Sequence, residues 1–194
     1  MNHIEKLINR IPALAPLASE IEGAVAAICQ MHRAGGKLLL CGNGGSAADC
    51  EHISGELLKG FLQKRPPVED VPKVLQQGVA AIPLPSLSAS LSAFANDVEP
   101  ALVYAQLTYA LGRQGDVFMG LSTSGNSRNV VEAAEVAKKQ GLLTIALTGA
   151  TGGKLASICH ITIRVPETET YLVQELHLPV YHAICAEVEE RLFG

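Results

Sequence analysis

Tryptophan is absent from the 194 residues of this chain, and aromatic residues make up only 4% of it. Proteins that bind single-stranded nucleic acid stack the bases on aromatic side chains, so this deficit argues against that class. The chain also has no run of Lys or Arg, and its formal net charge is −4. A negative chain without a basic stretch is poorly suited to a phosphate backbone, so we expect no nucleic acid as the main ligand.

The five cysteines form no CxxC pair and are odd in number, so their spacing indicates no disulfide framework. Unpaired cysteines are typical of a reducing compartment. The first ten residues are polar and lack the apolar segment of a secretory signal. No apolar run reaches the length of a membrane span. We therefore expect a cytoplasmic protein that has no membrane partner.

What the chain does have is a hydrophobic content of 48%, rich in Ala, Leu and Val. A chain of this length can bury a sizeable core, and we interpret residues 1–194 as one domain. Apolar runs alternate with helix-compatible segments, which is typical of an α/β protein with a parallel sheet covered on both faces. The predicted strands are residues 37–41, 79–83, 116–121, 142–147 and 161–165, and the predicted helices are residues 46–62, 86–95, 99–113, 127–140, 152–158 and 169–192.

Two segments lie outside this alternation. Residues 1–33 show apolar side chains at helical spacing, and Pro12 and Pro16 are expected to break them into pieces. Their apolar residues occupy more than one face, which favours packing against partner chains, although packing on the protein's own sheet explains it as well. Residues 64–78 are rich in proline and charge, and we predict a surface loop there with one helical turn at 71–76.

Two turns between a strand and a helix have the chemistry of an anion site. Glycine lets the backbone approach a phosphate closely, and the start of a helix offers unpaired N–H groups. The carboxyl ends of parallel strands are where ligands bind, so we predict one small phosphorylated ligand between the turns. Alternatively, Ser and Gly only cap the two helices. The residues are Asn43, Gly44, Gly45 and Ser46 in the first turn, and Ser122, Thr123, Ser124 and Ser127 in the second.

A second group of polar residues suggests a metal. His52 and Glu56 are four residues apart, so both side chains leave one face of a predicted helix. Gln174 and His182 are eight residues apart in the last helix and share a face, although Pro179 between them is expected to kink it. Nitrogen and oxygen donors from two helices suit zinc or a similar divalent ion. Taken alone, a His-x-x-x-Glu pair is more often a surface ion pair or a capped core histidine than a metal site, and these interpretations stay open here.

Taken together, these motifs resemble the phosphoheptose isomerases, which are sedoheptulose 7-phosphate isomerases of the sugar-isomerase (SIS) superfamily. The resemblance covers nearly the whole chain in order and includes the pair Asn96-Asp97 and the pattern Gln174-Glu175-x-His177-x-x-x-x-His182. It implies a three-layer αβα sandwich with a five-stranded, flavodoxin-like parallel sheet. It also implies a homotetramer with active sites at subunit contacts. The implied reaction interconverts sedoheptulose 7-phosphate and a glycero-manno-heptose 7-phosphate through an enediol, with one zinc or similar divalent ion per site.

The same resemblance implies a role for each residue. Glu56 and His182 correspond to the catalytic proton-transfer pair, and Asn96 and Asp97 to a sugar-contacting loop. The implied zinc ligands are His52, Glu56, Gln174 and His182. The implied phosphate-binding residues are Ser46, Ser122, Thr123, Ser124 and Ser127, and the wider substrate-binding set adds Asn43, Gly44, Gly45, Glu56, Asn96, Asp97 and Gln174.

Two positions depart from the family pattern. Tyr171 stands where an Asp is common, and Gly60 stands where an Arg is usual, with Lys59 beside it. These departures bear on the orientation and identity of the sugar more than on phosphate or metal binding. The alternatives to an isomerase are a non-catalytic SIS protein that senses a phosphosugar or binds a replication initiator, and a structural oligomer with an empty cleft. Such relatives tend to lack the His and Glu pair, so its presence favours the enzyme.

Overall fold

The computed structural model describes residues 1–194 and contains one five-stranded sheet in the order β2-β1-β3-β4-β5. Every neighbouring pair is parallel, so the predicted α/β fold is confirmed, and the order 2-1-3-4-5 is the flavodoxin-like one. Each predicted strand lies within two residues of an observed one. The strands are β1 (Leu38–Cys41), β2 (Ala81–Pro83), β3 (Val117–Ser122), β4 (Leu143–Thr148) and β5 (Ile161–Arg164).

The sheet separates two hydrophobic cores. In β1, Leu38 and Leu40 belong to the larger core, whereas Leu39 and Cys41 belong to the smaller one, as the alternation of side chains along a strand requires. All residues of β1 and β3 are buried. Helices on both faces exclude water from these strands, which explains why they are continuous apolar runs.

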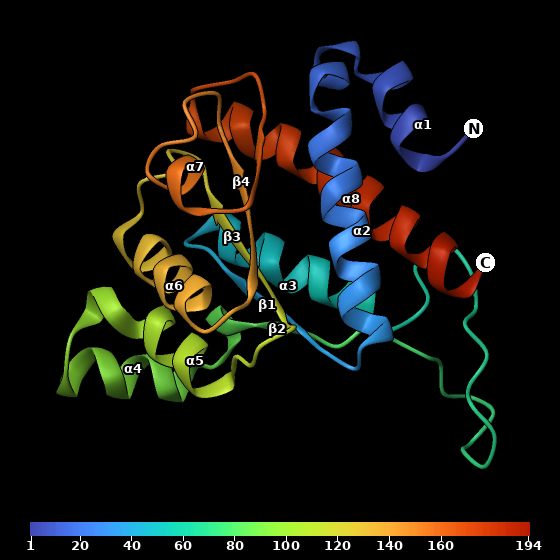
Figure 1. Cartoon of the computed structure of the whole chain (residues 1–194), viewed down its shortest axis with the longest axis horizontal. Helices are drawn as coiled ribbons and strands as arrows, with labels where there is room; N and C mark the ends of the chain where they lie inside the picture. Colours follow the sequence, from blue (N-terminus) through green and yellow to red (C-terminus); the bar gives the residue numbers. More distant parts are fainter.

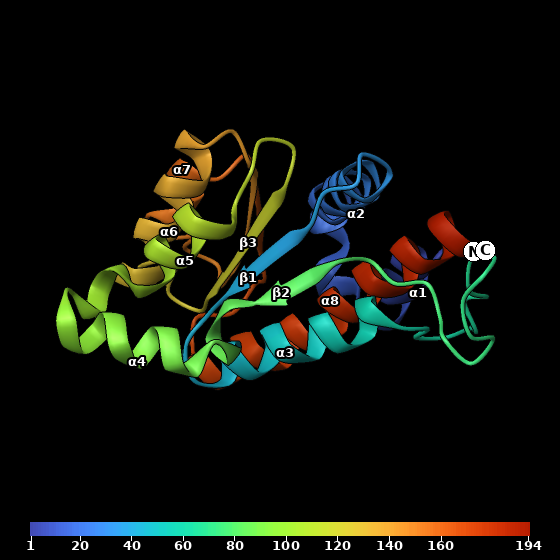
Figure 2. The ribbon, with the colours of Figure 1, turned by 90° about the horizontal axis from the view of Figure 1, so that it is seen from below.

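Helices from the two ends of the sequence cover the larger core, and helices from the middle cover the smaller one (Figures 1 and 2). On the first face lie α1 (His3–Arg10), η1 (Pro12–Leu17), α2 (Ala18–Arg33), α3 (Gly45–Leu58) and α8 (Thr170–Phe193). Against the second core pack η2 (Leu84–Ser86), α4 (Ser88–Asp97), η3 (Pro100–Leu102), α5 (Val103–Leu111), α6 (Arg128–Lys139) and α7 (Leu155–Ile158).

The N-terminal segment breaks at Pro12 and packs on its own chain. Its longest helix, α2, buries Ile21 and Ile28 and contacts α8 and β5. The stretch Pro12–Arg33 is by length and composition apolar enough to cross a membrane, which the sequence analysis did not anticipate. In this structure α2 packs one face against α8 and β5, and Glu22 on its outer face binds Arg191 at 2.6 and 2.7 Å.

The segment between α3 and β2 differs from its prediction. α3 ends at Leu58, four residues early, because Lys59 adopts an extended backbone (φ −144°, ψ 177°). The predicted helical turn at 71–76 is wrong: this segment holds only a turn, closed by the Leu75 N–H donating to the Pro72 carbonyl at 2.9 Å. Prolines lack the N–H that a helix needs, and Pro66, Pro67 and Pro72 keep the segment a loop.

Candidate functional site

The two glycine- and serine-rich turns meet at one point of the sheet. β1 and β3 are neighbours, with Cys41 opposite Gly120, so both turns leave the same edge. The first turn leads to α3 on one face, and the second leads to α6 on the other. Diverging connections of this kind open a crevice at the carboxyl ends of the strands, which is the usual ligand site of such sheets.

Glycine geometry shapes both turns. Gly44 has φ +57° and Gly125 has φ +66°, a left-handed conformation that side chains disfavour. At Gly125 a Cβ would lie 2.0 Å from the carbonyl oxygen of Gly152, so the backbones approach too closely for any other residue. The N-cap residues of α3 and α6, Gly44 and Ser127, make no side-chain capping hydrogen bond, although the Val130 N–H of α6 donates to Oδ1 of Asn129. Both helix starts remain suited to an anion.

Hydroxyl groups line the second turn. The Oγ atoms of Ser122 and Ser127 lie 2.9 Å apart, and Ser124 accepts a hydrogen bond from the Asn126 N–H at 3.1 Å. Ser46, at the start of α3, is almost fully buried, as is Ser122. This set of hydroxyls and helix starts offers donors to a phosphate without a Lys or Arg.

A pair of amides joins the two turns. Asn43 in the first turn and Asn129 in α6 exchange two hydrogen bonds of 2.9 Å. The sequence analysis singled out Asn43 but missed Asn129, whose only signal is its place in the helix turn that follows Ser127. These two hydrogen bonds tie the first turn to the start of α6, which follows the second turn.

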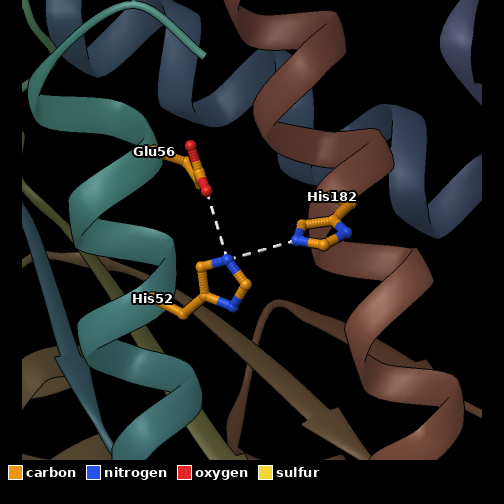
Figure 3. A group of neighbouring side chains, drawn as sticks. All are labelled: His52, Glu56 and His182. Atoms are coloured by element: carbon orange, nitrogen blue, oxygen red, sulfur yellow. Dashed lines mark hydrogen bonds and ion pairs between the residues drawn. The ribbon is translucent and has the colours of Figure 1, made fainter. Parts of the chain in front are cut away.

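A cluster of three side chains lies between α3 and α8 (Figure 3). The Nε2 atom of His52 is 3.1 Å from Oε1 of Glu56 and 3.4 Å from Nε2 of His182. Two side chains from successive turns of α3 and one from α8 therefore meet at the Nε2 atom of His52. Of these three residues, His182 lines an open pocket of about 270 Å³ between α1, α8 and residues 61–62, to which Lys6 and Arg10 contribute positive charge.

These three residues fit a divalent metal ion. Their ligand atoms all lie within 4.8 Å of one another. Two ligands that are each about 2.0–2.1 Å from a tetrahedral zinc ion lie roughly 3.4 Å apart, close to the separations of 3.1 and 3.4 Å found here. Two imidazoles and one carboxylate are a donor set that zinc, iron and similar ions accept.

Gln174, the fourth expected ligand, lies elsewhere in this chain. Its side chain packs over Gly45, where an added Cβ would be 2.7 Å from its Nε2 atom. Its amide therefore lies at the first turn of α3, beside the anion site. α8 is one continuous helix through Pro179, and it places His182 two turns further along. The structure thus brings three of the four predicted ligands together.

The surroundings of His182 favour its neutral form. Burial lowers the pKa of His182, the neighbouring His52 lowers it further, and Glu56 opposes both effects. A neutral imidazole has a free lone pair, which can bind a metal or accept a proton. Glu56 keeps 18% of its side chain exposed.

Two residues that the sequence analysis did not place in the site support His52. The hydroxyl group of Tyr181 lies 2.9 Å from Nδ1 of His52 and donates to Oδ1 of Asp49 at 3.1 Å. Burial raises the pKa of the Asp49 carboxyl, and the hydrogen bond from Tyr181 opposes the rise. Asp49 precedes His52 by three residues, so helical spacing could have placed both on one face of α3. Tyr181 adjoins His182 but neighbouring residues of a helix do not face each other, so only the tertiary structure reveals its role.

Arg65 is a further residue that the sequence analysis missed. It is fully buried, and its guanidinium group binds Oε1 of Glu189 at 2.8 Å. The same group donates to the carbonyl oxygens of Glu56 (3.1 Å) and Leu57 (2.7 Å), which end α3. Nothing in the proline-rich loop distinguishes Arg65 from the exposed Lys64, so only the tertiary structure reveals it.

The other expected sugar contacts lie apart from the cluster in this chain. Asn96 and Asp97 sit at the exposed end of α4, which belongs to the opposite face (Figure 2). Tyr171 is exposed at the start of α8. At Gly60 a Cβ would be 2.1 Å from the carbonyl oxygen of Gln63, so the loop excludes an arginine at this position.

Comparison with known proteins agrees with this architecture. The model of the SIS domain family matches residues 2–149. The phosphoheptose isomerase of Aneurinibacillus thermoaerophilus is 40% identical over 197 residues, which cover 99% of this chain and 93% of that protein. The solved phosphoheptose isomerase of Neisseria gonorrhoeae superimposes with a TM-score of 0.81 at 34% identity, covering 97% of this chain and 95% of the other. The enzyme from Francisella tularensis gives a TM-score of 0.83 at 29% identity, covering 96% and 94%.

The fold and the site therefore define a SIS-domain protein of the sugar-phosphate isomerase class. Within that class the chain belongs to the phosphoheptose isomerase family, whose members are aldose–ketose isomerases. The resemblance noted from the motifs is confirmed.

Proposed function

We propose that this chain interconverts sedoheptulose 7-phosphate and a glycero-manno-heptose 7-phosphate through an enediol. The observation that carries the proposal is the meeting of His52, Glu56 and His182 across two helices. A base, an imidazole and a metal-ligand set at one point are what an aldose–ketose isomerisation needs. Kinship with phosphoheptose isomerases supplies the substrate class.

The serine-rich turns would hold the phosphate group. Ser46 and the hydroxyls of Ser122, Thr123, Ser124 and Ser127 supply donors beside two helix starts. Ser46 and His52 are six residues apart, about 9 Å along α3. A ligand that touches both in one chain must therefore be an extended phosphorylated molecule, as a phosphorylated heptose is.

Glu56 is the proposed base. Its carboxylate would take the proton from the carbon beside the carbonyl and return it to the neighbouring carbon, which converts ketose to aldose. His182 in its neutral form would transfer the proton between the hydroxyl and carbonyl oxygens. Each such contribution is worth about 10²–10⁴-fold in rate.

His52, Glu56 and His182 would hold the divalent ion, with Gln174 as a fourth ligand after a change of its side-chain conformation. When bound, zinc or a similar ion supplies a positive charge that stabilises the negative oxygen of the enediol. The donor set supports one ion per cluster.

We also propose that this chain forms a homotetramer and that it is located in the cytoplasm. α4 buries none of its residues, and Val98 and Tyr109 near it are exposed apolar side chains. A second copy of the chain would cover this face and could bring Asn96 and Asp97 to a neighbouring site. Light scattering of the purified protein tests the assembly, and a monomer at micromolar concentration would contradict it.

A non-catalytic phosphosugar sensor is the second candidate. The NanR protein of Vibrio vulnificus, solved with ManNAc-6P, shares the fold at a TM-score of 0.62 and 16% identity. At that identity the likeness concerns the fold alone, and the cluster around His52 favours the enzyme.

Turnover separates the two candidates. Purified protein is incubated with sedoheptulose 7-phosphate, and the aldose product is followed with and without a chelator. We expect turnover that the chelator abolishes, and we expect Glu56→Gln to lower kcat by about 10²–10⁴-fold. The matched control is Glu51→Gln on the same helix, whose exposed carboxylate binds only Ser86. Binding of the sugar phosphate without turnover would favour the sensor, and near-native turnover by folded Glu56→Gln would remove the role of Glu56.

A further inference from the structure

A phenol links the cluster to a carboxylate that takes no part in it. Tyr181 on α8 is 1% exposed, and its hydroxyl group contacts two residues of α3. It lies 3.1 Å from Oδ1 of Asp49 and 2.9 Å from Nδ1 of His52. The rings of Tyr181 and His52 also meet edge to face, with centroids 5.5 Å apart. The orientation of the His52 ring is therefore set by a second helix.

The count of hydrogens links the tautomer of His52 to the direction in which the Tyr181 hydroxyl donates. A phenol has one hydrogen to donate, and an ionised carboxylate can only accept. When the Tyr181 hydroxyl donates to Asp49, its oxygen can only accept from His52. The hydrogen must then be on Nδ1, and a neutral His52 has its lone pair on Nε2.

This tautomer matters because of what Nε2 faces. Nε2 points at Oε1 of Glu56 and Nε2 of His182, and Nδ1 points away from both (Figure 3). Without the phenol, the favourable arrangement places the hydrogen on Nε2, where it donates to the Glu56 carboxylate. That hydrogen occupies the space in which the three ligand atoms converge.

We propose that Tyr181 and Asp49 are positioning residues that keep the hydrogen of His52 on Nδ1 and aim the Nε2 lone pair at the cluster. Metal-binding histidines commonly donate their second ring N–H to an acceptor that fixes the tautomer. In this chain the acceptor is a phenol whose own hydrogen is committed to a carboxylate. The consequence for metal affinity rests on the proposed function, whereas the tautomer itself does not.

Nitrogen-15 NMR of the imidazoles tests the tautomer in metal-free protein. The spectra are recorded at pH 8.5, above the ordinary pKa of histidine of about 6.5. The signals of His52 are assigned with His52→Gln. We expect a hydrogen on Nδ1 in the wild type. We expect it on Nε2 in Tyr181→Phe, which removes the acceptor, and in Asp49→Ala, where the phenol turns its hydrogen to Nδ1.

Tyr104→Phe is the matched control. Tyr104 is also buried, and its hydroxyl donates to the Gly42 carbonyl at 2.7 Å instead of to a histidine. We expect this variant to keep the hydrogen of His52 on Nδ1. A hydrogen on Nε2 in the wild type, or an unchanged tautomer in both Tyr181→Phe and Asp49→Ala, would overturn the proposal.

Zinc affinity, measured by competition with a chromophoric chelator, tests the consequence. We expect Tyr181→Phe to lose about 10–100-fold in affinity and Tyr104→Phe to lose none. Circular dichroism checks that each variant is folded. Equal affinities in wild type and Tyr181→Phe would overturn the positioning role. Failure of the wild type to bind zinc would instead remove the metal from the proposed function, and the NMR result would still decide the tautomer.

Discussion

Arg65 and Glu189 form an ion pair of 2.8 Å in which both side chains are almost completely buried. Glu189 also accepts the N–H groups of Phe61 and Leu62 at 2.7 Å, and Arg65 binds the last carbonyls of α3. The pair therefore ties the loop after α3 to α8. Because Glu56 and His182 lie on these two helices, the same contact holds the two halves of the candidate site together.

Arg65→Met leaves the Glu189 carboxylate buried without its cation. Removing one partner of a buried ion pair costs about 3–5 kcal/mol, so we expect a loss of roughly 3 kcal/mol in the free energy of unfolding. Urea denaturation measures it, with Lys64→Met as the neighbouring exposed control at about 0.5 kcal/mol or less. A loss below about 1 kcal/mol for Arg65→Met would show that the backbone N–H groups alone satisfy Glu189.

Gly125→Ala places a Cβ 2.0 Å from the Gly152 carbonyl oxygen at a φ of +66°. The backbone must move, so we expect a destabilisation of about 2 kcal/mol or more and weaker binding of the sugar phosphate. Gly55→Ala is the contrasting variant. Gly55 lies within α3 with open space at its Cβ position, and alanine there should stabilise by about 0.5–1 kcal/mol. Thermal unfolding measures both variants: we expect a lower melting temperature for Gly125→Ala and a higher one for Gly55→Ala. Equal changes in melting temperature would contradict the steric argument.

His177 should make stability depend on pH. Its ring is fully buried, and burial lowers its pKa to about 4, an effect that the backbone of Thr148 partly opposes. The unfolded chain takes up a proton near pH 6.5, but the folded protein does so only near pH 4. The burial of neutral His177 therefore has no pH-dependent cost in the free energy of unfolding above about pH 6.5. As the pH falls towards 4, protonation of the unfolded chain lowers the free energy of unfolding by up to about 3 kcal/mol.

Urea denaturation between pH 7.5 and 4.5 measures this effect. We expect the free energy of unfolding of the wild type to fall more steeply with decreasing pH than that of His177→Leu. Parallel curves would mean that His177 is not buried as a neutral group.

A metal that binds only the folded protein should raise its stability. At a free zinc concentration of about 100 times the Kd, the expected gain is about 2.7 kcal/mol. We expect His182→Ala to abolish most of this gain, because it removes one of the three converging ligands. His32→Gln, which removes a histidine lying against Phe193, should keep it. Calorimetric melting with zinc and with a chelator makes the comparison, and an equal response of both variants would place the ion elsewhere.

The order of strands and helices could be predicted from the sequence because its signals are local. Apolar runs, helical spacing and glycine at the turns predicted all five strands to within two residues and the break at Pro12. The end of α3 could not be predicted, because long-range contacts of Arg65 and Gln76 determine the segment that follows it. The secondary-structure propensity of a residue does not show which distant residue it will bind. The predicted surface loop over residues 64–78 is present, and only its helical turn at 71–76 was wrong.

In the candidate site, too, local sequence signals predicted some features and long-range contacts decided the others. Spacing along α3 was enough to pair His52 with Glu56, since residues four apart share a helix face. That His182 joins them while Gln174 packs over Gly45 was decided by the way α8 lies along α3. Asp49, Tyr181, Asn129 and Arg65 acquire their partners only through tertiary packing. The amino-acid sequence thus determined the elements and the chemistry available to them. The packing of the helices decided which groups meet, because hydrogen bonds form only between atoms about 3 Å apart.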